Sequence, residues 1–150
     1  MRRTVLVAAA MIVLGGAYAA AQSNEVIDAL LGRDVADFGS SLQLILSAGH
    51  RVDENASVAD AYATFQSLGW RLQSKGIDDS LTAKELSYLI MRSLGLTGGI
   101  MYTILPSPRY AFRELVYVGI ISRQVPPGRI VSGQQVVRYL GAVLRLTEAQ

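Results

Sequence analysis

The side chains best suited to binding chemistry are the arginines in the C-terminal half of this 150-residue chain. Residues 86–150 contain seven basic residues, all arginine, and two acidic ones, a net charge of +5. Residues 22–85 contain five basic and ten acidic residues, a net charge of −5. A planar guanidinium can bind a carboxylate or phosphate through two hydrogen bonds, so an arginine-rich surface suits an anionic partner. The candidate ligand-binding residues are Arg109, Arg113, Arg129 and Arg138.

Two interpretations of these arginines are open. Arg109 and Arg113 are four residues apart in a predicted helix and share one side of it, whereas Glu114 is expected to point elsewhere. If the arginines converge on an exposed groove, they indicate an anionic glycan or an acidic protein partner. Alternatively, they attract the acidic N-terminal half and stabilise the fold. No dense run of basic residues occurs, so nucleic acid is not expected as a partner.

Groups able to catalyse a reaction are few. The chain has no cysteine and one histidine, His50, so it offers no thiolate and no zinc-ligand set. His50 follows a predicted helix end, where it can interact with the last carbonyl groups, and no nucleophile-elbow motif accompanies it. We therefore expect no catalytic residue, no metal site and no cofactor.

Carboxylates leave one enzymatic alternative, a small envelope hydrolase with a general acid and a general base. Glu114, or Asp78 with Asp79, would supply these groups if the fold placed two carboxylates about 5–9 Å apart in a cleft. Solvated turn residues are the simpler interpretation of such acids. Tyrosines beyond residue 21 suit stacking on sugar rings, although most recur at the spacing of a helix core: Tyr62, Tyr88, Tyr102, Tyr110, Tyr117 and Tyr139.

Residues 1–21 have the pattern of a cleavable secretory signal peptide. Arg2 and Arg3 precede an apolar stretch over residues 5–14, and small residues follow. Cleavage is expected after Ala21, with Ala19 as the alternative. The apolar stretch is shorter than the ~20 residues that span a bilayer, and no later segment is apolar enough to span. We therefore expect a single domain over residues 22–150, located in the periplasm or cell envelope.

Capping motifs mark the starts of two of the helices that position these side chains. Thr82 and Glu85 form a capping box, and Ser132 with Gln135 repeats it fifty residues later. The predicted helices run over residues 82–95 and 132–146. Seven positions match at this offset, among them the two helix starts, which predicts an internal repeat.

Each capped helix has an earlier partner helix. One is predicted over residues 57–75 and ends at Gly76-Ile77, and the other begins at Ser107-Pro108 and ends at Gly119-Ile120. The repeat unit is therefore a helix, a Gly-Ile turn, a loop and a capped helix, over about residues 57–96 and 107–146. The equivalent positions Ile90 and Leu140 are expected to be buried in one core.

The predicted fold class is all-α, a small domain of about five helices. It consists of the two helix–loop–helix repeats and an N-terminal helical segment. That segment contains a helix over residues 34–49 and a shorter one near residues 25–31. Residues 97–105 are predicted to form a connector that is partly extended and buried.

This layout resembles that of S-layer homology repeats, in which a second helix typically opens with Thr-Arg-Ala-Glu. Here the corresponding segments are Thr82-Ala83-Lys84-Glu85 and Ser132-Gly133-Gln134-Gln135. The resemblance covers about residues 57–146 and implies a noncovalent anchor to cell-wall polysaccharide, with Thr82, Lys84 and Glu85 as further ligand-binding candidates. The motif arginine is absent at Ala83 and Gly133, and Lys84 is displaced by one position. The fold therefore transfers more readily than the ligand.

These observations predict a noncatalytic, exported interaction domain of the cell envelope. Its expected partner is an anionic cell-wall glycan or an envelope protein.

Overall fold

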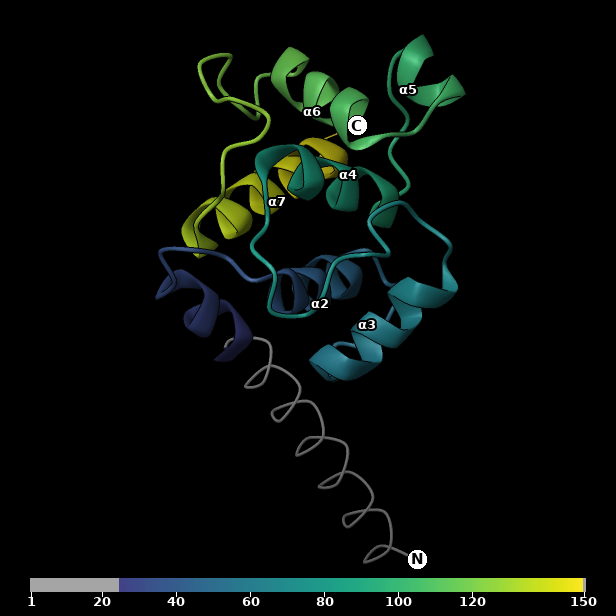
Figure 1. Ribbon diagram of the computed structural model, residues 1–150. Helices are drawn as coiled ribbons and strands as arrows, with labels where there is room; N and C mark the ends of the chain where they lie inside the picture. The colour runs from purple at the N-terminus through teal and green to yellow at the C-terminus, as the bar shows by residue number, and fades with distance from the viewer. Residues whose placement is uncertain (1–24, 150) are drawn as a thin grey trace, which may run out of the picture.

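Helices make up the regular secondary structure of the domain, as the predicted all-α class requires. The computed structural model describes residues 25–149, which form no strand and only two isolated pairs of bridging residues (Figure 1). These described residues form seven helices, where about five were expected. They are an opening helix over residues 25–31, α2 (Phe38–Ala48), α3 (Val58–Ser67), α4 (Ala83–Ser93), α5 (Ile100–Ile104), α6 (Pro108–Tyr117) and α7 (Gly133–Glu148). The expected signal peptide, residues 1–21 with cleavage after Ala21, lies outside the described residues.

The end of α3 corrects the predicted helix over residues 57–75. The helix ends at Ser67, because Gly69 adopts a left-handed conformation at φ +62° just after the C-cap. Leu72 also has a positive φ, +79°, so the chain cannot continue as a helix there. The start of α2 is later than predicted, since the Asp37 carboxylate accepts a hydrogen bond from the Ser40 N–H and caps a helix that begins at Phe38.

The connector over residues 97–105 also differs from its prediction. Instead of an extended, buried segment it contains α5, one short helix at the edge of the domain (Figure 1). Only Tyr102 of this helix is buried, whereas Ile100 and Ile104 are 78% and 74% exposed. The apolar residues of this segment therefore lie on the surface and not in the core.

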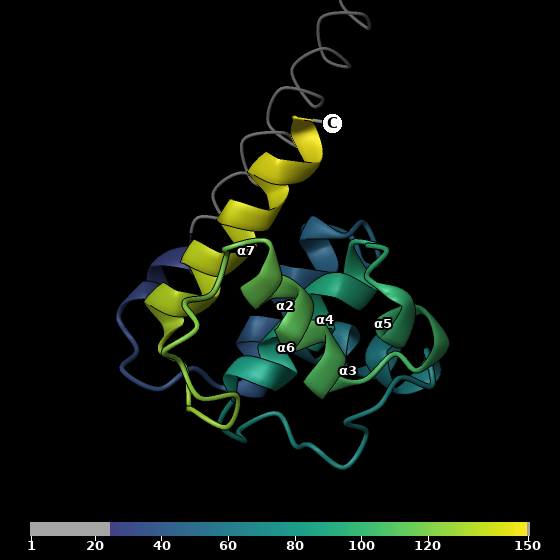
Figure 2. The ribbon, with the colours of Figure 1, turned by 90° about the horizontal axis from the view of Figure 1, so that it is seen from above.

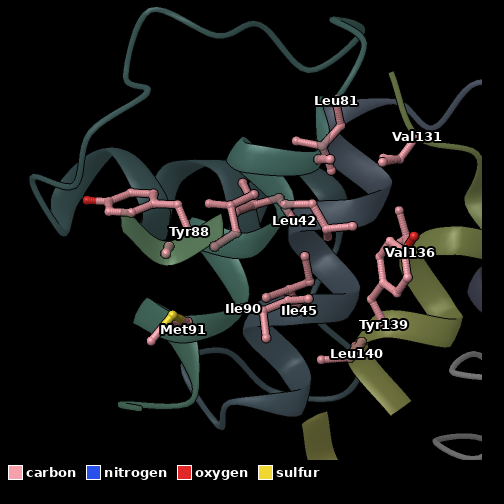
Figure 3. Packing of buried hydrophobic residues seen from close by; sticks show 14 of the residues in the cluster. Leu42, Ile45, Leu81, Tyr88, Ile90, Met91, Val131, Val136, Tyr139 and Leu140 are labelled. Carbon is pink, nitrogen blue, oxygen red and sulfur yellow. The ribbon is translucent and has the colours of Figure 1, made fainter. Parts of the chain in front are cut away.

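The core is built around α4, nine of whose eleven residues are buried. α4 packs against α6 and α2, and α2 packs in turn against α3 and α7. Figure 3 shows Ile90 of α4 beside Ile45 of α2, with Leu140 of α7 close by. Ile90 is fully buried and Leu140 is 4% exposed, which confirms the predicted burial of both positions.

A ring of three backbone hydrogen bonds connects the starts of α2, α4 and α7. The Ala36 N–H donates to the Val131 carbonyl (2.9 Å), Val131 N–H to the Leu81 carbonyl (2.9 Å), and Leu81 N–H to the Ala36 carbonyl (3.1 Å). Each of these buried residues immediately precedes the N-cap of its helix. The three helices therefore begin at one junction.

The first amides of the three helices are satisfied in the opposite cyclic order, from α2 to the segment before α4, from α4 to that before α7, and from α7 to that before α2. The Phe38 N–H of α2 donates to the carbonyl of Asp79, in the loop before α4, at 2.7 Å. The Ala83 N–H of α4 donates to Arg129, in the loop before α7, at 2.8 Å. The Gly133 N–H closes the cycle on the Arg33 carbonyl, before α2, at 3.0 Å. Amides without an intrahelical partner thus bond to the next segment of the ring.

α7 is the longest helix, and its first residue is in the closest contact of the junction. Its C-terminal end projects from the domain, whereas its N-terminal end lies beside the opening helix (Figure 2). A Cβ atom at Gly133 would collide with the backbone carbonyl of Leu30, in the last turn of that opening helix. The junction thus requires glycine at this position because two backbones meet there.

Replacement of Gly133 by alanine should therefore destabilise the domain, by about 1–3 kcal/mol, since backbone must shift to admit the methyl group. Gly141→Ala is the matched control in the same helix. Its Cβ would make only an ordinary contact with the Arg145 side chain, 3.6 Å away, so the change should stabilise by about 0.4–1 kcal/mol. Chemical denaturation of both variants measures the difference. Equal stabilities would show that the Leu30 contact does not constrain the junction.

Candidate functional site

A concavity lined by charged and aromatic side chains lies between α5 and α6. This cavity has a volume of about 470 Å³, and we name it the α5–α6 groove. Ile100 and Met101 of α5 line it together with side chains of α6 and of the turn after it. Its polar and aromatic members are Tyr110, Arg113, Glu114, Tyr117 and Arg123. The groove therefore combines two positive charges, one carboxylate and two phenol rings.

α6 presents these side chains because its start and its inner side are fixed. The Ser107 hydroxyl accepts a hydrogen bond from the Tyr110 N–H (3.4 Å), and Pro108 occupies the first helical turn. Ala111, Phe112 and Leu115 are buried against the core. Arg113 and Tyr117, one turn apart, consequently lie on the outer side, and Tyr117 is 83% exposed.

The Glu114 side chain approaches the start of α5. A Cβ atom at Gly99 would lie 3.0 Å from the Glu114 Oε1 atom, and one at Gly98 would lie 3.0 Å from its Cγ. The two glycines thus leave room for the carboxylate, which lines the same groove as Arg113. No ion pair joins Glu114 to an arginine among residues 25–149.

α5 is held in place by one buried tyrosine and one arginine. Tyr102 is 5% exposed, and its hydroxyl has no hydrogen-bond partner in the described part of the chain. Desolvation raises the pKa of Tyr102 to about 12, although the positive charge of Arg92 opposes the rise. The Arg71 Nε donates to the carbonyl of Pro106 at 3.1 Å, just past the helix. These contacts fix the apolar side of the groove.

The four predicted arginines are not brought together in one groove. Arg113 alone of them lines the α5–α6 groove. Arg109 is exposed one turn earlier on α6, Arg129 lies in the loop at the helix junction, and the Arg138 guanidinium lies 5.0 Å from the centre of the Tyr139 ring on α7. Arg123 was not among the predicted binding residues. It is the second arginine that lines the groove, because the turn after α6 folds back beside that helix.

The ion pairs of the fold do not connect its acidic and basic halves. The pairs found among the described residues are Arg33–Asp37 and Lys75–Glu85, and both lie in the N-terminal half. None of the four predicted arginines forms an ion pair within the same part of the chain. The interpretation that they stabilise the fold by direct pairing therefore lacks the contacts that it requires.

Thr82, Lys84 and Glu85 lie at the start of α4, apart from the groove. The Thr82 N–H donates to the Glu85 Oε2 at 2.9 Å, and the Lys75 ammonium lies 3.2 Å from the same oxygen. The Thr82 Oγ1 is buried without a hydrogen-bond partner in the described residues, and only the Lys84 side chain is exposed. Thr82 and Glu85 thus begin the helix and leave little surface for a ligand.

The remaining titratable candidates lie in turns. Asp79 accepts a hydrogen bond from the Gly76 N–H (2.8 Å), and Asp78 is exposed beside it. The side-chain hydrogen bond from Ser57 lowers the pKa of the exposed Asp60 carboxyl. His50 is exposed just past α2, in the left-handed region at φ +53°. Within residues 25–149 no three His, Cys, Asp or Glu side chains are grouped so that they could hold a metal ion.

Comparisons of the chain with protein-family models, with curated proteins and with solved structures find no match. None of the helices in the described region combines the length and apolar character needed to cross a bilayer.

The pKa of Tyr102 gives a pH-dependent prediction for the wall of the groove. The folded state retains the phenol proton up to about pH 12, above the ordinary pKa of 10.0. The contribution of Tyr102 to the free energy of unfolding is therefore at its full value below about pH 10 and decreases as the pH rises from there to about 12. Tyr102→Phe should leave stability near neutral pH unchanged or slightly higher, because the hydroxyl has no partner. The variant should also lose less stability at alkaline pH.

Urea denaturation of both proteins near neutral pH and at about pH 11 tests this difference. The wild-type chain should weaken more than the variant over this interval, and the other tyrosines contribute equally to both. Parallel losses would mean that the Tyr102 hydroxyl is hydrated in the folded protein.

Proposed function

We propose that this chain is a noncatalytic, exported interaction domain of the cell envelope that binds an anionic cell-wall glycan in the α5–α6 groove. The observation that carries the proposal is the pair of groove arginines, Arg113 and Arg123, which have no ion-pair partner among residues 25–149. Export is proposed from the signal pattern of residues 1–21.

The groove has the chemistry that an acidic saccharide requires. Tyr110 and Tyr117 offer aromatic rings against which a sugar ring can stack, and the guanidinium groups can bind carboxylates or phosphates on it. Glu114 lies on the side of the glycines, where it can accept hydrogen bonds from sugar hydroxyls. An acidic segment of an envelope protein would meet the same charges, and the test below distinguishes the two.

The repeat architecture is part of the same proposal. α3 begins fifty residues before α6, as α4 begins fifty residues before α7. Ser57 and Ser107 are the N-caps of α3 and α6, and a left-handed glycine follows each helix, Gly69 and Gly119. The predicted alignment of Gly76-Ile77 with Gly119-Ile120 is replaced by this one, because α3 ends earlier.

A third unit follows from the hydrogen-bond ring. Ala36 immediately precedes the N-cap of α2, just as Leu81 and Val131 immediately precede the N-caps of α4 and α7. We therefore interpret residues 36–48 as the capped helix of a third, shortened repeat. Three such units support the proposed relation to S-layer homology domains, whose repeats often occur in threes and anchor proteins to the cell wall.

The alternative of a carboxylate hydrolase has less support. A glycosidase requires two carboxyl groups about 5–9 Å apart. Glu114 is the single acidic residue that lines the groove, and Asp78 and Asp79 lie in the turn before α4. No arrangement of the described side chains favours this second function.

The groove proposal predicts which arginines matter. Arg113→Gln combined with Arg123→Gln should reduce retention on purified cell-wall sacculi by about tenfold or more, because each charge-assisted hydrogen bond contributes ~1.5–3 kcal/mol. Stability should change by less than about 0.5 kcal/mol per substitution, since both residues are exposed. A pull-down at low and moderate salt, with melting curves of the same samples, measures both quantities.

The matched control is Arg129→Gln with Arg138→Gln, which removes the same charge outside the groove. It should retain binding at moderate salt. Equal losses in the two double variants would indicate attraction to net charge alone. Retention by an envelope extract but not by sacculi would assign the groove to a protein partner, against the glycan.

A further inference from the structure

α5 and the residue after it expose four large apolar side chains close together in the sequence. Ile100 and Ile104 are 78% and 74% exposed, and Met101 and Leu105 are about half exposed. In both ribbon views this helix lies at the edge of the domain (Figures 1 and 2). A cluster of large apolar side chains that remains in water marks a surface that another phase or molecule covers.

Basic side chains surround this cluster. Arg113 and Arg123 line the groove together with Ile100 and Met101. Arg71 donates to the carbonyl of Pro106, directly after Leu105. Arginines therefore lie near both ends of the apolar segment, and the Glu114 carboxylate in the groove is turned toward Gly99.

Hydrogen bonds within α5 close its single turn. The Thr103 N–H donates to the Gly99 carbonyl and the Leu105 N–H to the Met101 carbonyl, both at 3.0 Å. The Thr103 hydroxyl lies 3.2 Å from the carbonyl oxygens of Gly98 and Gly99. The other amide and carbonyl groups of so short a helix have no partner within it, which suits the hydrated interface of a bilayer and not its hydrocarbon core.

From this combination we infer that α5 docks the domain on an anionic phospholipid surface. Ile100, Met101, Ile104 and Leu105 enter the interfacial layer, and Arg71, Arg113 and Arg123 bind lipid phosphates around them. Apolar burial together with attraction between arginine and anionic headgroups is the general basis of peripheral membrane binding. This inference goes beyond the proposed glycan binding and does not depend on it.

A second copy of the chain fits this surface less well. A standard protein interface buries ~800 Å² on each partner, which is more than three side chains of a five-residue helix and the adjoining Leu105 supply. Two copies related by a twofold axis would also place their arginines against each other, and like charges repel. A bilayer surface has neither restriction.

The chain contains no cysteine, so one fluorophore can be placed on α5 without other changes. An environment-sensitive dye on Ile104→Cys should shift to shorter wavelength with phosphatidylcholine vesicles that contain about a quarter phosphatidylglycerol, and not with phosphatidylcholine alone. The same dye on Val35→Cys, exposed at the helix junction, should not respond. Because the label reports its own position, residues 1–24 do not contribute to the signal.

Two double variants in the labelled chain test the charges. Arg113→Gln with Arg123→Gln should weaken vesicle binding about fivefold per arginine, and Arg129→Gln with Arg138→Gln should have little effect. A response to both kinds of vesicle alike, to neither, or equally at Val35→Cys would overturn the inference. So would a shift that follows protein concentration without vesicles, which would indicate self-association.

The lipid and glycan proposals fail separately. Ile104→Ser with Leu105→Ser removes apolar surface from residues that do not line the groove. This double variant should lose flotation with anionic vesicles, whereas the control Val35→Ser with Ile130→Ser should keep it, and both should be retained on lipid-free sacculi. Loss of sacculus binding with unchanged flotation would contradict the lipid inference and leave the glycan proposal intact.

Discussion

The ring of backbone hydrogen bonds among Ala36, Leu81 and Val131 is the interaction on which the rest of the structure depends. The three residues are buried, so their amides and carbonyls have no access to bulk water and must bond to one another. The bonds also join segments that are 45, 50 and 95 residues apart in the sequence, which brings α2, α4 and α7 to one starting point. Because the ring is formed by main-chain atoms, a side-chain substitution can preserve it, whereas a displacement of the backbone breaks it. A Cβ atom at position 133 would force such a displacement, so glycine is required there.

The junction determines where the candidate site lies. α4 runs from the ring through the core, so its end and the loop after it emerge on the opposite side of the domain. α6 packs along α4 and presents its outer side next to α5. The groove and the exposed apolar tip are therefore far from the start of α4, where the family resemblance placed Thr82, Lys84 and Glu85. In this chain those positions build the junction, and Glu85 is 8% exposed.

Local signals predicted what local interactions determine. The capping motifs located the starts of α4 and α7 because a cap is formed within four residues, and the helical period placed Ile90 and Leu140 in the core. The end of α3 was predicted too late because Leu68 and Leu72 continue the apolar helical period of Ala61 and Phe65. Trp70 packs edge-on against Phe65, after the chain has turned at Gly69. Periodicity does not show such a turn. Of the groove residues, the sequence predicts Arg113 as a ligand-binding residue. The positions of Arg123 and Glu114 in the groove depend on tertiary packing, which the sequence pattern does not show.

The central claim is that an anionic glycan binds between α5 and α6. The most direct measurement is a titration of the ¹⁵N-labelled protein with soluble acidic fragments released from cell-wall polysaccharide, followed by amide and arginine side-chain NMR signals. The account predicts saturable shifts at Tyr110, Arg113, Tyr117 and Arg123, with small changes at the start of α4. Shifts centred on Thr82, Lys84 and Arg129, or no saturable shift, would contradict it.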